Sequence, residues 1–193
     1  MITLQGFIYP RKGHALAIEA LATLPETLHL VFAGAVVDGQ ERLLKALLAL
    51  AQQLQVDHRL TVTGYLCDAD LDLYLRASDV AICPFETMSA SGSLSRWIAQ
   101  EKPIVATALP QIEAYNQLAA DPRPTDPMNK DQPPKAIATF APYTAAALAR
   151  CIRTQLTQPT STQAQQQLKS QLSLPQIFQR HFECYTKVLG TIP

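Results

Sequence analysis

Short apolar runs alternate with helix-like segments along most of this chain, and this alternation limits the folds that it can adopt. Five apolar runs precede residue 110, and four segments with helix spacing lie between them. Buried strands that alternate with helices are typical of a parallel sheet covered by helices on both faces. Right-handed crossovers make such a sheet doubly wound. We therefore predict a single Rossmann-like α/β domain over residues 1–193.

The periodicity of each segment predicts its structure. Strands are expected at 2–8, 28–35, 59–65, 79–85 and 102–108, with a sixth at 135–141. Helices are expected at 14–24, 39–55, 68–78 and 94–101, and in a helical C-terminal segment (142–193) at 144–156, 163–171 and 174–189. Asp68 is the expected N-cap of its helix. The proline-rich stretch 121–134 is expected to be a surface loop, with a lid as the alternative.

The last expected helix carries a broad apolar face. Ile177, Phe178, Phe182 and Tyr185 recur at helical spacing. An uncovered face of this kind favours association, so we expect a second domain, a partner chain or a homodimer to cover it.

The composition excludes several classes of protein. Sixteen basic and sixteen acidic residues cancel, which argues against a nucleic-acid-binding protein. No apolar run reaches the roughly 20 residues of a transmembrane segment, and the N-terminus does not resemble a signal peptide, so a cytoplasmic location is expected. Four cysteines lie far apart, at 67, 83, 151 and 184, which predicts neither a metal site nor a disulfide framework.

Two loops of unusual composition are predicted to meet at one point of the sheet. With strand order 3-2-1-4-5-6, ligands bind beyond the carboxyl ends of the first and fourth strands. The loop after the first strand holds Arg11 and Lys12, and the loop after the fourth holds Ser89, Ser91, Gly92 and Ser93 before a helix. Positive charge facing a helix N-terminus favours a phosphate or diphosphate. The alternatives are a simple N-cap and a solvated turn.

Other catalytic signatures are missing from the sequence. There is no G-x-G-x-x-G, P-loop or G-x-S-x-G motif, and the four histidines form no constellation by spacing. His14 stands beside the basic loop, where it either reaches a ligand or starts a helix, partly exposed.

Four stretches occur in the order found in a known family. GFIYPRKGHALAIEAL, LHLVFAGA, LTVTGYLCDADLDLYLRASDVAICPF and SASGSLSRWIAQEKPIVAT resemble the C-terminal, nucleotide-sugar-binding domain of retaining group 1 glycosyltransferases of the GT-B fold. The resemblance spans roughly residues 4–115, and LPQIFQRHFECYTKVL looks like the closing helix of that domain.

The resemblance implies a role for several residues. It implies a nucleoside-diphosphate sugar as substrate, transfer with retention of configuration, and no need for a metal ion or other cofactor. The implied contacts are Arg11, Lys12, Ser91, Gly92, Ser93 and Leu94 for the diphosphate, Glu86 and Ser89 for the sugar, and Gly64, Tyr65 and Arg96 for the base or ribose. The resemblance also implies that the start of the helix after Tyr65 lines the base pocket.

The sequence departs from the family pattern at three places. Phe7 follows Gly6 where the family has an arginine, and Arg11 is the candidate substitute. The family often has two glutamates eight positions apart. Aligned on Pro103, these positions hold Met88 and Arg96, and counted from Glu86 the partner is Leu94.

Two functions from different classes are therefore kept. The chain is the donor half of a glycosyltransferase whose acceptor half lies elsewhere, or it is a truncated or degenerate nucleotide-binding domain that transfers nothing. A nucleotide-sugar epimerase of similar fold is a third, weaker hypothesis.

Overall fold

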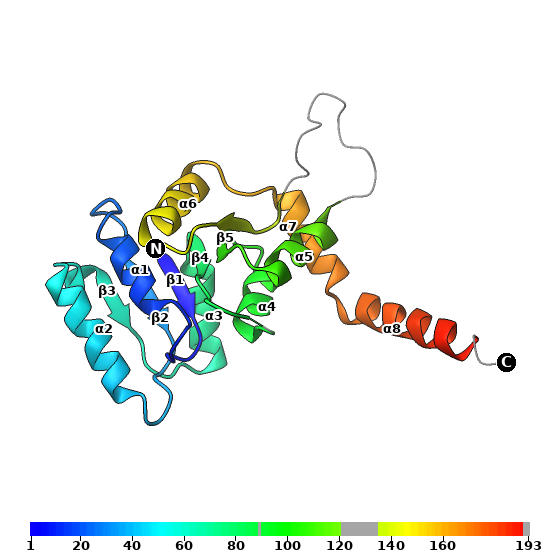
Figure 1. Ribbon diagram of the computed structural model, residues 1–193, viewed down its shortest axis with the longest axis horizontal. Helices are drawn as coiled ribbons and strands as arrows, with labels where there is room; N and C mark the ends of the chain where they lie inside the picture. The colour runs from blue at the N-terminus through cyan, green and yellow to red at the C-terminus, as the bar shows by residue number, and fades with distance from the viewer. Residues whose placement is uncertain (89, 121–134, 191–193) are drawn as a thin grey trace.

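A sheet of six parallel strands organises the fold, with helices packed on both of its faces (Figure 1). This computed structural model describes residues 1–88, 90–120 and 135–190. The strand order is β3-β2-β1-β4-β5-β6, so the predicted order and the predicted doubly wound class are both confirmed. The order reverses between β1 and β4, which lie side by side in the sheet.

The strands are shorter than the apolar runs that predicted them. Neighbouring strands pair in parallel register. For example, Ile2 of the first strand lies opposite Leu30 of the second, and Val105 of the fifth lies opposite Ala138 of the sixth. The runs extend into turns at glycine or proline, which end the ladder. The strands are β1 (Ile2–Gln5), β2 (Leu30–Ala33), β3 (Leu60–Val62), β4 (Val80–Cys83), β5 (Ile104–Thr107) and β6 (Ala138–Phe140).

All the predicted helices form within the described residues, together with one after β5 that the periodicity did not predict. The helices are α1 (His14–Leu21), α2 (Glu41–Gln53), α3 (Asp68–Ala77), α4 (Gly92–Ala99), α5 (Pro110–Ala119), α6 (Ala145–Thr157), α7 (Thr162–Gln171) and α8 (Leu174–Leu189), with a short 3₁₀ helix at Asp57–Arg59. Proline at the start of α5 suits the first helical turn, where its missing N–H has no partner to lose.

Side chains that alternate along each strand divide the core into two layers. Leu4, Phe32 and Ile82 pack on one face, which α1, α2 and α6 cover. Cys83 and Ala106, one step out of phase, pack on the other face, which α3, α4, α5 and α7 cover. Because successive residues of a strand point to opposite faces, both faces are apolar and the strands read as continuous apolar runs.

A buried amide fixes the segment that leads into the edge strand β6. The Nδ2 of Asn116 in α5 donates to the carbonyl of Ile137 at 3.0 Å, and the N–H of Ile137 donates to its Oδ1 at 2.9 Å. Both backbone groups would otherwise lie buried without a partner.

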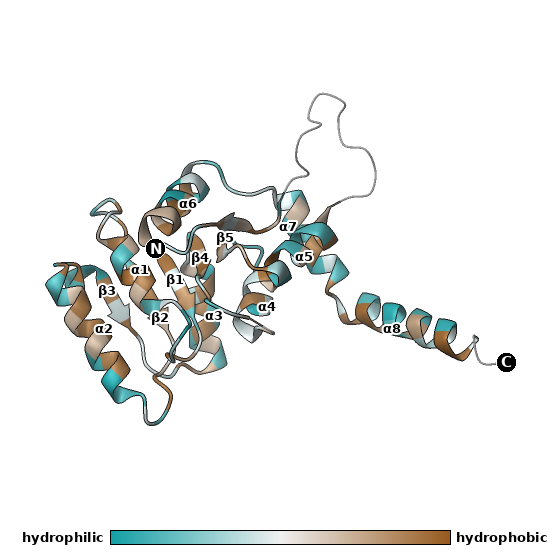
Figure 2. Cartoon of the chain, viewed as in Figure 1, coloured by the Kyte–Doolittle hydropathy of each residue, from teal (hydrophilic) through white to brown (hydrophobic). Residues whose placement is uncertain are grey.

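The last helix, α8, extends away from the rest of the chain and buries none of its residues (Figure 1). Apolar side chains line it between polar ones, as the colouring of Figure 2 shows. Phe178 is 74% exposed and Tyr185 68% exposed. The predicted apolar face is therefore present; Ile177 is partly buried, and Phe178, Phe182 and Tyr185 are exposed. None of the helices in the described part of the chain is both long and apolar enough to cross a membrane.

The N-terminal boundaries of α3 and α4, which border the cavity described below, differ from the prediction. Cys67, not Asp68, is the N-cap of α3, and its thiol donates to Asp70 at 3.2 Å. The helix α4 begins at Gly92 and not at Leu94, with Ser91 as its N-cap. Gly92 and Ser93 therefore belong to the first helical turn. The predictions for Ser89 and for the loop 121–134 concern residues outside the described ranges.

Candidate nucleotide-sugar site

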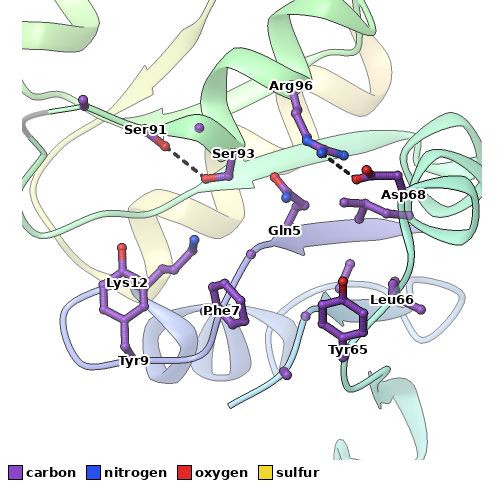
Figure 3. Close-up of a pocket in the computed structure, with 17 residues that line it drawn as sticks. Gln5, Phe7, Tyr9, Lys12, Tyr65, Leu66, Asp68, Ser91, Ser93 and Arg96 are labelled. Atoms are coloured by element: carbon purple, nitrogen blue, oxygen red, sulfur yellow. Dashed lines mark hydrogen bonds and ion pairs between the residues drawn. The ribbon is translucent and has the colours of Figure 1, made fainter. Parts of the chain in front are cut away.

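A cavity of about 470 Å³ opens where the strand order reverses. Its walls come from the ends of β1 and β2 and from the segments that follow β3 and β4. This is the place that a doubly wound sheet offers to a ligand. Figure 3 shows the residues that line it. They are Gln5, Gly6, Phe7, Tyr9, Lys12, Ala33, Gly34, Ala35, Tyr65, Leu66, Asp68, Leu71, Ala90, Ser91, Gly92, Ser93 and Arg96.

Lys12 is the buried cation of this cavity. Its side chain is only 5% exposed, and its Nζ lies 5.3 Å from the ring centre of Tyr9 and 5.7 Å from that of Phe85. Among the described residues no carboxylate pairs with it. Burial lowers the pKa of Lys12, although the nearby Cys83 opposes the shift. A cation taken from water without a counter-charge is costly, so this group is suited to receive an anion.

The start of α4 lies across the cavity from the β1 loop, and Lys12 points toward it (Figure 3). The Oγ of Ser91 accepts the N–H of Leu94 at 3.1 Å and lies 3.0 Å from the Oγ of Ser93. The cap thus satisfies the N–H of Leu94, while those of Gly92 and Ser93 sit in the first turn, where helices leave N–H groups unpaired. These groups and the helix dipole favour an anion here.

Glycines let the backbone segments of this cavity approach one another. A β-carbon on Gly34 would lie 2.3 Å from the carbonyl oxygen of Gly6, so the ends of β1 and β2 touch only because Gly34 has no side chain. Around Gly92 a β-carbon would meet nothing within 4 Å, so the first turn of α4 is open to a ligand.

The loops after β1 and β4 are tied together. Gly13 has a φ of +87°, and a β-carbon there would lie 2.0 Å from the carbonyl oxygen of Pro84. The hydroxyl of Tyr143 donates to that same carbonyl at 3.0 Å. The N–H of Glu86 donates to the carbonyl of Arg11 at 3.0 Å. The loop after β1 and the start of the loop after β4 are therefore fixed against each other.

Arg11 and Glu86 lie apart from the cavity that holds Lys12. Arg11 has a left-handed φ of +69°, and its Nε lies 3.6 Å from Oε2 of Glu86. The two side chains line a separate depression next to Tyr143 and α1. The structure thus brings Lys12, Ser91, Gly92 and Ser93 together but not Arg11 or Glu86, and buries the side chain of Leu94. Their assigned roles toward a donor stay predictions.

The far end of the cavity is formed by residues after β3. Tyr65 is 78% exposed and lines the cavity beside Leu66, whereas Gly64 precedes them at a φ of +72°. Here Arg96 of α4 and Asp68 of α3 form an ion pair, with Nη2 and Oδ1 2.7 Å apart. The start of the helix after Tyr65 was expected to line the base pocket, and its first residue, Asp68, lines the cavity; the place of Gln5 and the pairing of Asp68 with Arg96 were not predicted. Asp68 and Arg96 lie 28 positions apart in the sequence, so no local pattern links the two side chains.

His14 is buried, which contradicts the expectation of a partly exposed helix start. It is 3% exposed, and its ring meets Phe32 edge-on at 4.7 Å. Burial, and to a smaller extent the charge of Lys12, lower the pKa of His14 to about 3. The ring is neutral at neutral pH and packs as part of the core under the loop.

The family model described as "Glycosyl transferases group 1" matches residues 1–156. The chain belongs to the group 1 glycosyltransferases. No curated protein matches this glycosyltransferase chain at a significant level.

Solved structures of glycosyltransferases share the fold. The chain superposes on Anabaena HepE in complex with UDP and glucose with a TM-score of 0.75 at 19% identity, covering 96% of this chain and 48% of that one. The sucrose-phosphate synthase of Thermosynechococcus elongatus gives 0.69 at 22% identity, covering 98% and 45%. The chain thus spans about half the length of these enzymes.

A third similar structure contains only the C-terminal domain of its protein. It is the C-terminal domain of a group 1 family glycosyltransferase (LpcC) from Francisella tularensis, with a TM-score of 0.60 at 17% identity, covering 87% of this chain and 79% of that one. The fold of this glycosyltransferase chain is thus that of the C-terminal half of a GT-B enzyme, as the sequence motifs predicted.

Proposed function

We propose that this chain binds a nucleoside-diphosphate sugar and forms the donor half of a glycosyltransferase. The observation that carries the proposal is the buried ammonium of Lys12, which has no carboxylate partner among the described residues and faces the open first turn of α4. The diphosphate lies between the two. The HepE neighbour was solved in complex with UDP, which is a nucleoside diphosphate.

In this proposal the diphosphate needs no divalent metal ion. As the bond to the sugar breaks, negative charge grows on the departing diphosphate. Lys12 and the N–H groups of Gly92 and Ser93 stabilise that charge, and since they are already in place, no group has to reorganise. The sugar is transferred with retention of configuration, and the acceptor comes from a second domain or a partner chain. The four cysteines are free, as is usual in the cytoplasm, where we place the reaction.

A second function, nucleotide binding without transfer, is favoured by one observation. Glu86 was predicted to contact the donor sugar, yet its carboxylate pairs with Arg11 and lies outside the cavity of Lys12. A chain with this arrangement binds the nucleotide and leaves the sugar without that contact.

Calorimetric titration of the chain with UDP, GDP and ADP, and then with their sugars, tests the proposal. We expect one nucleotide to bind and Lys12→Ala to weaken it about 10- to 100-fold, the usual range for hydrogen bonds to a charged group. Lys45→Ala is the matched control, because Lys45 is exposed on α2 and lies outside the cavity. Absence of binding by all three nucleotides would refute the proposal.

The two functions separate in a second titration. If the chain is a donor half, the nucleotide sugar binds more tightly than the bare diphosphate, because the sugar adds contacts of its own. Equal affinities for the nucleotide and its sugar indicate nucleotide binding without transfer.

A further inference from the structure

The wall of the cavity away from Lys12 carries a bridge between two helices. The guanidinium of Arg96, in α4, donates to Oδ1 of Asp68, the first residue of α3 (Figure 3). The second oxygen of Asp68 accepts no hydrogen bond within the described residues. One carboxylate oxygen is thus held in place and the other is free to accept.

Stability alone accounts poorly for this pair. The side chain of Arg96 is 43% exposed and that of Asp68 is 86% exposed. Exposed ion pairs contribute about 0–1 kcal/mol, because water screens the charges and two long side chains lose freedom. The pair does, however, fix a carboxylate at the rim of a cavity whose opposite side is cationic.

The position of Arg96 along α4 sets its distance from the diphosphate. Arg96 comes four residues after Gly92, which opens the helix, so it lies about one turn, or 5.4 Å, further along the axis. In a nucleoside diphosphate the ribose is attached directly to the diphosphate and the base lies beyond it. With the diphosphate at the helix start, the group one turn away meets the ribose, and Tyr65 lies further on.

A buried polar side chain lies between the two ends of the cavity. Gln5, at the end of β1, is 9% exposed, and its Oε1 is buried with no hydrogen-bond partner. Figure 3 shows its amide directed between Ser93 and the pair of Arg96 and Asp68. A buried amide oxygen without a hydrogen-bond partner is costly, so this part of the wall is prepared for a polar ligand and not for an apolar one.

We propose that the carboxylate of Asp68 accepts hydrogen bonds from the ribose hydroxyls of the bound nucleotide and that Arg96 positions it. This inference rests on the proposed function. An ionised carboxylate can only accept hydrogen bonds, and the two adjacent ribose hydroxyls can both donate to it. This is why acidic side chains bind ribose in doubly wound folds. Arg96 also offsets the repulsion between Asp68 and the diphosphate. The site therefore selects ribonucleotides.

Titration with deoxy analogues tests this assignment. UDP, GDP and ADP are each compared with their 2′-deoxy and 3′-deoxy forms, on the unchanged chain and on Asp68→Ala. We expect the substitution to weaken the ribonucleotide about tenfold and to leave the deoxy form that has lost the contact unchanged. Asp70→Ala is the matched control, since Asp70 stands in the same first helical turn but does not line the cavity.

Arg96 acts through Asp68, and its variants show this. Arg96→Gln is expected to lower the preference for ribose over 2′-deoxyribose, and Arg96→Lys to retain most of it, because either cation can hold the carboxylate. A general loss of affinity with unchanged preference would overturn the positioning role.

The outcomes separate the two proposals. Binding of a ribonucleotide that Asp68→Ala weakens as much as its deoxy forms overturns the ribose assignment and leaves the proposed function intact. If none of the three diphosphates binds the unchanged chain, the proposed function fails and this assignment fails with it.

Discussion

The Nζ of Lys12 lies directly over the backbone of Gly6, so that a β-carbon on Gly6 would come within 2.4 Å of it and 3.8 Å of the β-carbon of Ser93. Because Gly6, which follows β1, has no side chain, it leaves the space that the side chain of Lys12 occupies. Gly6 has a φ of +109°, which side chains rarely adopt.

Gly6→Ala is expected to displace the Lys12 ammonium and to strain the backbone. We expect a loss of about 1–3 kcal/mol in the free energy of unfolding from the backbone alone, together with weaker nucleotide binding. Urea unfolding and calorimetry measure the two effects. The exposed Gly39→Ala, where φ is +81° and a β-carbon would meet nothing within 4 Å, is the control for strain without crowding. Equal nucleotide affinity in Gly6→Ala would contradict this account.

Lys12→Met is expected to make the fold more stable and the site inactive. Methionine loses the attraction of the ammonium for the rings of Tyr9 and Phe85, but its apolar side chain packs in the same space and removes a desolvated charge. We therefore expect a net gain of about 1–3 kcal/mol in the free energy of unfolding. Binding of the diphosphate should fall sharply in the same variant. Chemical denaturation and titration of one preparation test both statements, and a destabilised Lys12→Met protein would contradict the first.

The same variant should change how stability depends on pH. The pKa of Lys12 is lowered in the folded chain from its usual 10.5, so between the lowered pKa and 10.5 the unfolded chain binds the extra proton. The stability of the unchanged protein should therefore rise with pH across this window. Lys12→Met should lack that part of the rise, and Lys45→Met should keep it.

His14→Phe is expected to reduce the loss of stability in acid. Unfolding restores the ordinary pKa of 6.5, whereas the folded value is about 3, so acidification between these values favours the unfolded chain. By this linkage the unchanged protein loses about 2.5 kcal/mol between pH 7 and pH 4.5 through His14. Phenylalanine keeps the edge contact with Phe32. Parallel stability curves for the two proteins over this range would show that His14 is not responsible.

The exposed face of α8 is expected to make the chain associate. Phe178 and Phe182 are 74% and 60% exposed. Exposed apolar surface of this kind favours association with another molecule. Sedimentation velocity should show association that rises with concentration and weakens in the double variant Phe178→Ser, Phe182→Ser. Gln176→Ser with Gln179→Ser, both exposed on the same helix, serves as the control. A chain that stays monomeric at every concentration would contradict the expectation.

Local patterns were sufficient to predict the order of the sheet and the place of the cavity. The apolar runs and the turn residues between them report on burial and on chain reversal, and both are properties of neighbouring residues. These patterns predicted that β1 and β4 are neighbours in the sheet, and the motifs indicated the family. The start of α4 was placed too late because Gly92 and Ser93 have weak helix propensity, and the cap of Ser91 decides the boundary instead.

Contacts between distant residues could not be read in the same way. His14 looks like a polar helix start in the sequence, and its burial under the loop depends on Phe32, which belongs to another strand. Arg11 pairs with Glu86 across 75 positions, and Asp68 pairs with Arg96 across 28. Such pairings follow from how the loops meet in space, which no local periodicity encodes.

The connection of the two loops through Pro84 bears on the kinetics of binding. Its carbonyl oxygen receives the hydroxyl of Tyr143 and leaves no room for a side chain on Gly13. A nucleotide that reaches this crevice therefore meets the β1 loop and the start of the β4 loop already joined, and these two segments do not have to come together before it binds. We expect rapid association, with the lifetime of the complex as the quantity that distinguishes a good ligand from a poor one.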